Sequence, residues 1–196
     1  MKKNENAFTG LEAAIVLIAF VVVAAVFSYV MLGAGFFTAQ EAQTVVHTGM
    51  GQAASSIEVL GDVYGFNGTS TTENSSIVNI SYTIGLTSGN QPMDIARMRV
   101  TLATPDYREI LELANDTAKG DPDRGQWAVT NIYDEVNPGD LVLDPNEKFQ
   151  ITVRAPNNKA IGPDTRFTIS MQPEVGAMTT VVRTTPADIK PVNVLR

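Results

Sequence analysis

Few residues of this chain are of types that do chemistry at a site. His47 is the only histidine and cysteine is absent, so neither a His-based catalytic triad nor a site built on several His or Cys ligands is expected. Gly49-Met-Gly51-Gln-Ala-Ala has the spacing of a dinucleotide fingerprint, but that fingerprint follows a strand, and a helical pattern precedes it here. We therefore predict no catalytic residue, no cofactor site and no enzymatic activity.

Acidic side chains gather in the turns of the second half of the chain: Asp134, Glu135, Asp140, Asp144 and Glu147. Carboxylate oxygens are ligands for calcium, so these turns would suit a structural cation; the alternative is a solvated acidic surface. Asp121-Pro-Asp123-Arg-Gly125 resembles the start of a calcium loop but lacks the later acidic ligand. No metal-binding residue is therefore assigned. The net charge of −7 excludes nucleic acid as a partner.

Four asparagines stand in Asn-x-Ser/Thr sequons, which accept N-linked glycans in exported proteins: Asn67, Asn74, Asn79 and Asn115. Chance occurrence is the alternative, because this region is rich in Ser, Thr and Asn. Three of the four lie close together, which favours a glycosylated surface.

Glu12 stands alone at the head of a long apolar segment. No charged residue occurs from Ala13 to Ala39, and about 18 apolar residues are enough for a helix to cross a bilayer. A helix that is apolar on every face requires lipid or other protein around it. Glu12 is then either placed favourably near the positive end of the helix, or paired with a free α-amino group created by cleavage upstream.

The elements around this segment define its topology. Lys2 and Lys3 precede it and the next basic residue is Arg97, which predicts that the N-terminus is inside and the rest outside. The apolar run is longer than that of a secretory signal, so we expect it to be retained. Amphipathic spacing extends the predicted helix to Leu60, with a stop at Gly61 and Asp62. We assign residues 8–61 to this helix.

The remainder, residues 62–196, has the pattern of an outer β domain. Short β-rich segments separated by turn residues predict strands near 77–85, 96–103, 127–133, 139–143, 148–155, 165–171 and 176–183. The segment that begins at Val63 is predicted to be a loop, and Tyr107–Ala114 either a helical turn or a loop. The fold class is α+β: a long N-terminal hydrophobic helix followed by an antiparallel, Ig-like β-sandwich.

The segment FTGLEAAIVLIAFVVVAAV, from Phe8 to Val26, resembles the N-terminus of archaeal flagellins (archaellins), members of the type IV pilin-like superfamily. Leu32-Gly-Ala-Gly-Phe-Phe37 continues the resemblance, which is strong over about the first 40 residues. Near the C-terminus, Phe149–Val153, Gly176 and Val182–Pro186 resemble the closing strands of the family more weakly.

The resemblance implies that a prepilin-type signal peptidase removes a short leader. Its register places the cut between Ala7 and Phe8, so that residues 1–7 form the leader and Glu12 becomes the fifth residue, in the place of the acid of type IV pilins. The family usually has Gly before the cut and basic residues close by, whereas this chain has Glu5-Asn6-Ala7. Cleavage after Asn6 is therefore an alternative.

The resemblance also implies a function. The chain is expected to be an extracellular structural subunit that polymerises with copies of itself into the helical archaeal motility filament, the archaellum. Its precursor would be inserted in the membrane, and its partners would be the assembly platform and the filament motor. The alternatives are an adhesive type IV pilus subunit and a membrane-anchored monomeric β-domain binding protein.

Overall fold

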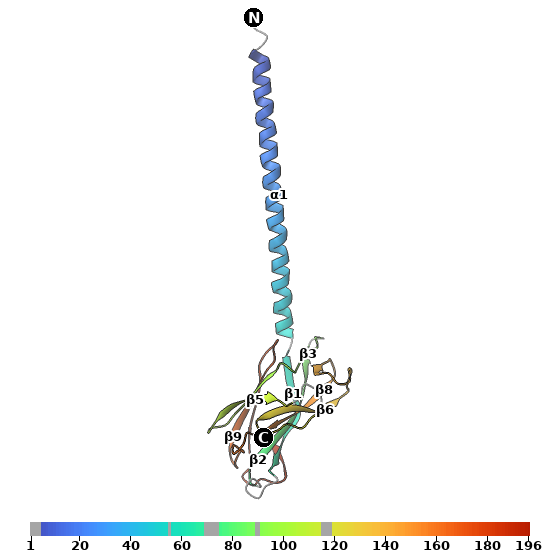
Figure 1. Cartoon of the computed structure of the whole chain (residues 1–196), viewed down its shortest axis with the longest axis vertical. Coiled ribbons are helices and arrows are strands. Elements are labelled where there is room, and N and C mark those ends of the chain that lie inside the picture. The colour runs from blue at the N-terminus through green and yellow to red at the C-terminus, as the bar shows by residue number, and fades with distance from the viewer. Residues whose placement is uncertain (1–4, 55, 69–74, 89–90, 115–118) are drawn as a thin grey trace. The chain divides into compact units, whose positions relative to one another are not determined.

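A computed structural model describes residues 5–54, 56–68, 75–88, 91–114 and 119–196 of the chain (Figure 1). The chain divides into two compact units, residues 1–49 and 50–196. The described residues of the first unit are helical, and the strands of the described residues lie in the second.

Helix α1 covers Glu5–Ala54, 50 residues, which corresponds to about 75 Å at 1.5 Å per residue. No proline interrupts it, and Gly33 and Gly35 lie in continuous helix. Threonines in its C-terminal third bond back to the helix: Thr38 Oγ1 donates to the Ala34 carbonyl at 2.9 Å, and Thr48 Oγ1 to the Thr44 carbonyl at 2.8 Å. These hydroxyls are thus satisfied without water.

The predicted end of the helix near Leu60 is wrong. Helix α1 ends at Ala54, and the first strand, β1, covers Ser56–Asn67. Gly61 adopts a φ of +75°, and the register with the neighbouring strand shifts between Leu60 and Tyr64. The glycine that predicted a helix stop therefore makes a bulge within a strand, because only glycine adopts positive φ without strain. The segment from Val63 to Asn67, predicted as a loop, is the second half of the same strand.

The strands after β1 are β2 (Ile77–Ser88), β3 (Met93–Asp94), β4 (Arg99–Ala103), β5 (Arg108–Leu113), β6 (Gln126–Tyr133), β7 (Val142–Leu143), β8 (Lys148–Arg154), β9 (Arg166–Gln172), β10 (Thr179–Thr184) and β11 (Val192–Leu195). All seven predicted strands are present, although several are shorter than predicted. Residues 108–113, predicted as a helical turn or loop, are strand β5. Strand β11 was not predicted.

Among the described residues, nine strands form one hydrogen-bonded sheet in the order β10-β9-β4-β5-β6-β8-β2-β1-β11, and β3 pairs with β7. Every pairing is antiparallel except that of β5 with β6. The two ends of this order meet: Thr179 Oγ1 of β10 donates to the Ile57 carbonyl of β1 at 2.7 Å, and the Thr184 N–H donates to the Arg196 carbonyl at 2.8 Å. The sheet therefore folds over onto itself, as expected for a mostly antiparallel β domain.

The core of this domain lies between the two halves of the folded sheet. Strand β8 shows the alternation that builds it: Phe149, Ile151 and Val153 are fully buried, whereas the residues between them are not. Trp127 and Phe167 fill the core from β6 and β9. Full burial of such side chains stabilises the fold by about 1.5–3 kcal/mol each. The core cluster of the described residues lies between Ile57 and Leu195, within the second unit.

Glu147 offers a sharp test of this domain. Only 2% of the residue is exposed, and its two carboxylate oxygens accept the backbone N–H groups of Val136, at 3.2 Å, and Asp144, at 3.0 Å. In a fragment of residues 56–196, which we expect to fold as a β-rich monomer, Glu147→Gln replaces one acceptor by an NH₂ donor facing an N–H. We expect a loss of about 2 kcal/mol, measured by denaturant unfolding.

The exposed carboxylate of Asp134 provides the matched control. Lys148 Nζ lies 3.1 Å from the Asp134 carboxylate, and the Asp134 side chain is 67% exposed. Surface ion pairs of this kind contribute between about 0 and 1 kcal/mol, so Asp134→Asn should leave stability nearly unchanged. Equal stability of Glu147→Gln and the parent would contradict the bridging role of Glu147.

Candidate assembly surface

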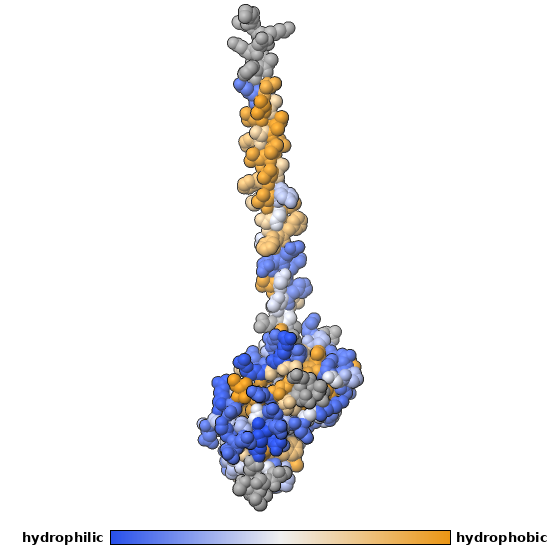
Figure 2. Space-filling model, viewed as in Figure 1, coloured by the Kyte–Doolittle hydropathy of each residue, from blue (hydrophilic) through white to orange (hydrophobic). Residues whose placement is uncertain are grey.

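Helix α1 carries a continuous apolar surface that no part of the described chain covers. Its large apolar side chains from Leu11 to Met50 are all more than half exposed, from 53% for Val22 to 80% for Tyr29. Figure 2 shows this surface in orange along the N-terminal part of the helix and polar residues further on. By length and composition, Gly10–Gly51 is also the one helix among the described residues that could cross a membrane. Such a surface requires lipid or other chains around it.

The side chains on this helix leave hollows between them. One is lined by small residues, Ala19 and Ala24, together with larger ones such as Phe20, Val23 and Phe27. Hollows of this shape receive side chains of a neighbouring helix, as ridges pack into grooves. Since apolar residues occur on every face of α1, the helix can pack against neighbours on several sides at once.

Glu12 is exposed at the head of this surface, and the described residues give it no ion pair. The next acid along the helix is Glu41, about 43 Å further on at 1.5 Å per residue. Ala7 and Phe8, the residues of the predicted cut, lie in the first turns of α1, where only the backbone is described. Position 8 precedes Glu12 by four residues, a spacing that places two groups on one helix face.

The sequon asparagines lie in different surroundings. Asn67 ends β1 and is half-buried, and its N–H donates to the Pro191 carbonyl. Asn79 lies within β2, and its Oδ1 is buried without a partner. Ser81 of the same sequon is 3% exposed and accepts a bond from Gln150 Nε2 at 2.9 Å. Glycan transfer requires an accessible amide, so Asn79 is a poor acceptor in the folded domain. Asn74 and Asn115 lie outside the described residues.

Several carboxylates of the acidic turns already accept hydrogen bonds from other groups of the protein. Glu147 and Asp144 are buried; the Glu147 carboxylate accepts backbone N–H bonds, and that of Asp144 accepts the Asn137 Nδ2 bond at 3.0 Å. Lys119 donates to Glu135 at 2.7 Å, which lowers the pKa of that carboxyl below its ordinary value, with help from the Gly139 N–H. Within the described ranges, no three His, Cys, Asp or Glu residues are grouped to hold a metal ion. The turn carboxylates thus act as internal acceptors.

His47 and the glycine motif after it are parts of α1. His47 is exposed on the helix, and Gly49 and Gly51 are helical residues, so no strand precedes the motif. The dinucleotide fingerprint therefore lacks the strand–turn–helix context that its phosphate-binding chemistry requires.

Comparisons with known proteins agree with this arrangement of an apolar helix and a β domain. The family model for archaeal-type flagellin matches residues 7–183. Probable flagellin 1 of Archaeoglobus fulgidus is 39% identical over 198 residues, covering 98% of this chain and 96% of the relative. The 24 kDa flagellin of Methanospirillum hungatei is 97% identical over 30 residues, which cover 15% of this chain and 94% of that sequence.

A solved structure extends the similarity to three dimensions. A chain of the archaeal flagellum of Methanospirillum hungatei strain JF1 matches with a TM-score of 0.72 and 31% identity, covering 94% of this chain and 98% of that one. The present chain belongs to the archaeal-type flagellin family. The family resemblance of the N-terminal segment is thereby confirmed.

Proposed function

We propose that this chain is the structural subunit of a helical archaeal motility filament, in which copies of α1 pack together while the β domain stays in water. The observation that carries the proposal is the apolar surface of α1, exposed on every face over the 27 uncharged residues from Ala13 to Ala39. Soluble monomers rarely expose a continuous apolar surface of this extent to water. The family and the flagellum structure support the same assignment.

The mechanism of such a subunit is physical. Before assembly the helix resides in the membrane, and on assembly it exchanges lipid for the helices of neighbouring copies. Because lipid is already apolar, close packing and fit drive this exchange more than release of water does. A filament results when one patch of each subunit meets a different patch of the next without ring closure. No catalytic group takes part.

Electron microscopy of native protein tests this function directly. We expect long filaments of uniform width that sediment without detergent. A detergent-bound monomer would instead favour a membrane-anchored binding protein. Short, non-rotating fibres in a cell that keeps its motility after deletion of the chain would favour an adhesive pilus subunit.

Processing and export are further parts of the proposal. A prepilin-type signal peptidase would remove residues 1–7, the membrane would hold the precursor, and an assembly platform with the filament motor would take up the product. The intact mass and N-terminal sequence of native protein test this. We expect the chain to start at Phe8, or at Ala7 if the cut follows Asn6, and a native chain that still begins at Met1 would contradict the proposal.

The same mass measurement reports on glycans. We expect added mass on at least one of Asn67, Asn74 and Asn115 and none on Asn79, because Asn79 is half-buried in a strand that is paired on both sides. Peptide mapping locates the modified residue. A bare chain mass would rule glycosylation out.

A further inference from the structure

The outer face of β4, β5 and β9 holds a groove of about 520 Å³ that the function above does not use. Its lining combines cationic side chains with hydroxyl and amide groups: Arg97, Arg99, Thr101, Arg108, Ser170, Gln172, Pro173, Glu174 and Met178. The sheet register explains how they meet. Arg99 lies opposite Gln172 and Thr101 opposite Ser170, while Arg108 lies opposite Ala103. Residues that are far apart in sequence thus share one face of the sheet.

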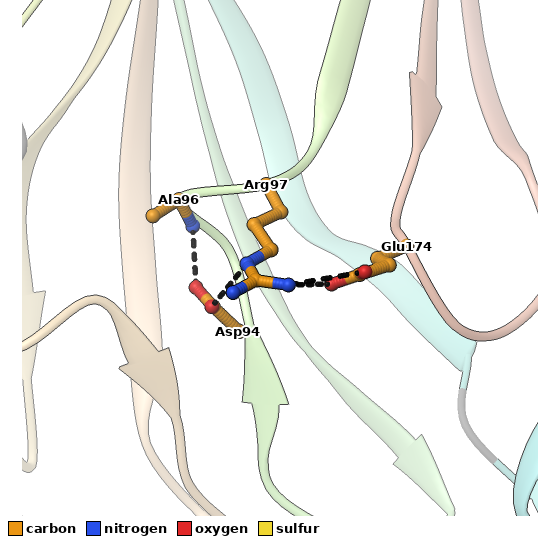
Figure 3. A network of polar contacts seen from close by, with 4 residues as sticks. All are labelled: Asp94, Ala96, Arg97 and Glu174. Carbon is orange, nitrogen blue, oxygen red and sulfur yellow. Dashed lines mark hydrogen bonds and ion pairs between the residues drawn. The ribbon is translucent and has the colours of Figure 1, made fainter.

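Only one of the three guanidinium groups in this groove is neutralised. Arg97 Nη1 donates to both oxygens of Glu174, at 3.1 and 3.0 Å, and its Nε lies 3.5 Å from Asp94 Oδ2 (Figure 3). In the described part of the chain, Arg99 and Arg108 have no ion pair and no side-chain hydrogen bond, and both are exposed. Two free guanidinium groups beside hydroxyl groups form a site for carboxylates, which arginine binds with two parallel bonds.

The same chain also carries a segment of opposite, negative charge. Residues 121–147 contain seven carboxylates and one basic residue, Arg124. Asp144 and Glu147 are buried among these, and Glu135 is paired with Lys119. Asp121 and Asp123 are exposed, and the described residues give their carboxylates no ion pair. They lie in the segment before β6, outside the groove. The cationic groove and these aspartates are therefore two separate patches of one subunit.

We propose that the Arg99–Arg108 groove of one subunit binds the Asp121 and Asp123 carboxylates of a neighbouring copy. Because the two surfaces are different patches of one chain, the contact is heterologous and continues from copy to copy. The inference rests on the proposed function, since a filament holds many β domains at high local concentration. Opposite charges at this contact would fix the register of neighbouring β domains, whereas the apolar helices supply adhesion without direction.

Charge reversal in native filaments tests the contact. Arg99→Glu/Arg108→Glu should release about tenfold more soluble subunit than the parent when filaments are diluted at low ionic strength and sedimented. Lys190→Glu/Arg196→Glu, which reverses two exposed charges flanking β11, is the matched control and should behave as the parent. At about 1 M salt the Debye length falls to roughly 3 Å, so the amounts of subunit released from the variant and from the parent should become equal.

The full exchange, Arg99→Glu/Arg108→Glu with Asp121→Arg/Asp123→Arg, keeps the net charge and restores opposite charges at every contact. It should recover most of the stability that either pair of changes removes. Failure to recover, or equal release from the parent and the groove variant, would overturn the proposal. If the parent bound a soluble acidic polysaccharide and the groove variant did not, while both formed filaments of equal stability, the groove would be assigned to that ligand instead. A parent chain that forms no filaments would refute the proposed function rather than the groove alone.

Discussion

Val22→Asp is expected to abolish filaments while leaving the β domain folded. Val22 lies in the middle of the uncharged segment of α1, where apolar residues occur on every face. In a packed array of such helices, the new carboxylate has no cation within reach. The cost of burying it is several kcal/mol per subunit, and every subunit of the polymer bears that cost. Electron microscopy and sedimentation of the secreted fraction measure the effect.

Two further variants separate assembly from membrane storage. Gln43→Asp adds the same charge to the same helix, but beyond the apolar segment and beside Glu41, so filaments should persist. Val22→Leu keeps the position apolar and should also assemble. The Val22→Asp precursor should still be found in the membrane fraction, because one acid raises the insertion free energy of a long apolar helix by only about 3 kcal/mol. Filaments of normal length from Val22→Asp would show that this position is not buried between helices.

The helix and the type of the second domain could be predicted because their signals are local. An uncharged run of this length has few structural solutions, and strands such as β8 show a strict alternation of buried and half-buried residues. The end of the helix was misplaced because Ile57 and Leu60 fit a helical period as well as a strand. The positive φ of Gly61 decides between them, and it depends on pairing with β2, which is distant in sequence.

Strand β5 is a second case in which pairing between strands, rather than the local sequence, determines the structure. Its sequence, REILEL, consists of good helix formers, and its pairing with β4 and β6 overrides that preference. The arginine groove was not predicted for a related reason. Arg99, Arg108 and Gln172 come from three strands, and only the register brings them to one face. Local pattern alone contains no signal for such a site.

Glu12→Ala is expected to be processed and stored in the membrane but to enter filaments poorly. If Phe8 is the mature terminus, its new ammonium lies four residues before Glu12 on one helix face, or meets the Glu12 carboxylate of a neighbouring copy. Either pairing offsets a charge that is costly among apolar helices, and removal of one partner leaves the other buried and uncompensated, at about 3–5 kcal/mol. In cells that produce parent and variant together, the variant should be more than tenfold under-represented in filaments.

The conservative variants decide whether pairing or simple placement near the helix start explains the effect. Glu12→Asp keeps the charge with a shorter reach, so a paired role predicts intermediate incorporation. Favourable placement near the positive helix end predicts incorporation equal to the parent for Glu12→Asp and only a small loss for Glu12→Ala, because that interaction contributes about 0.3–1 kcal/mol. Glu41→Ala, which removes an acid from the same helix outside the apolar segment, should not change incorporation. If Glu12→Ala competed as well as the parent, the carboxylate would have no role in assembly, and the helix would pack through its apolar surface alone.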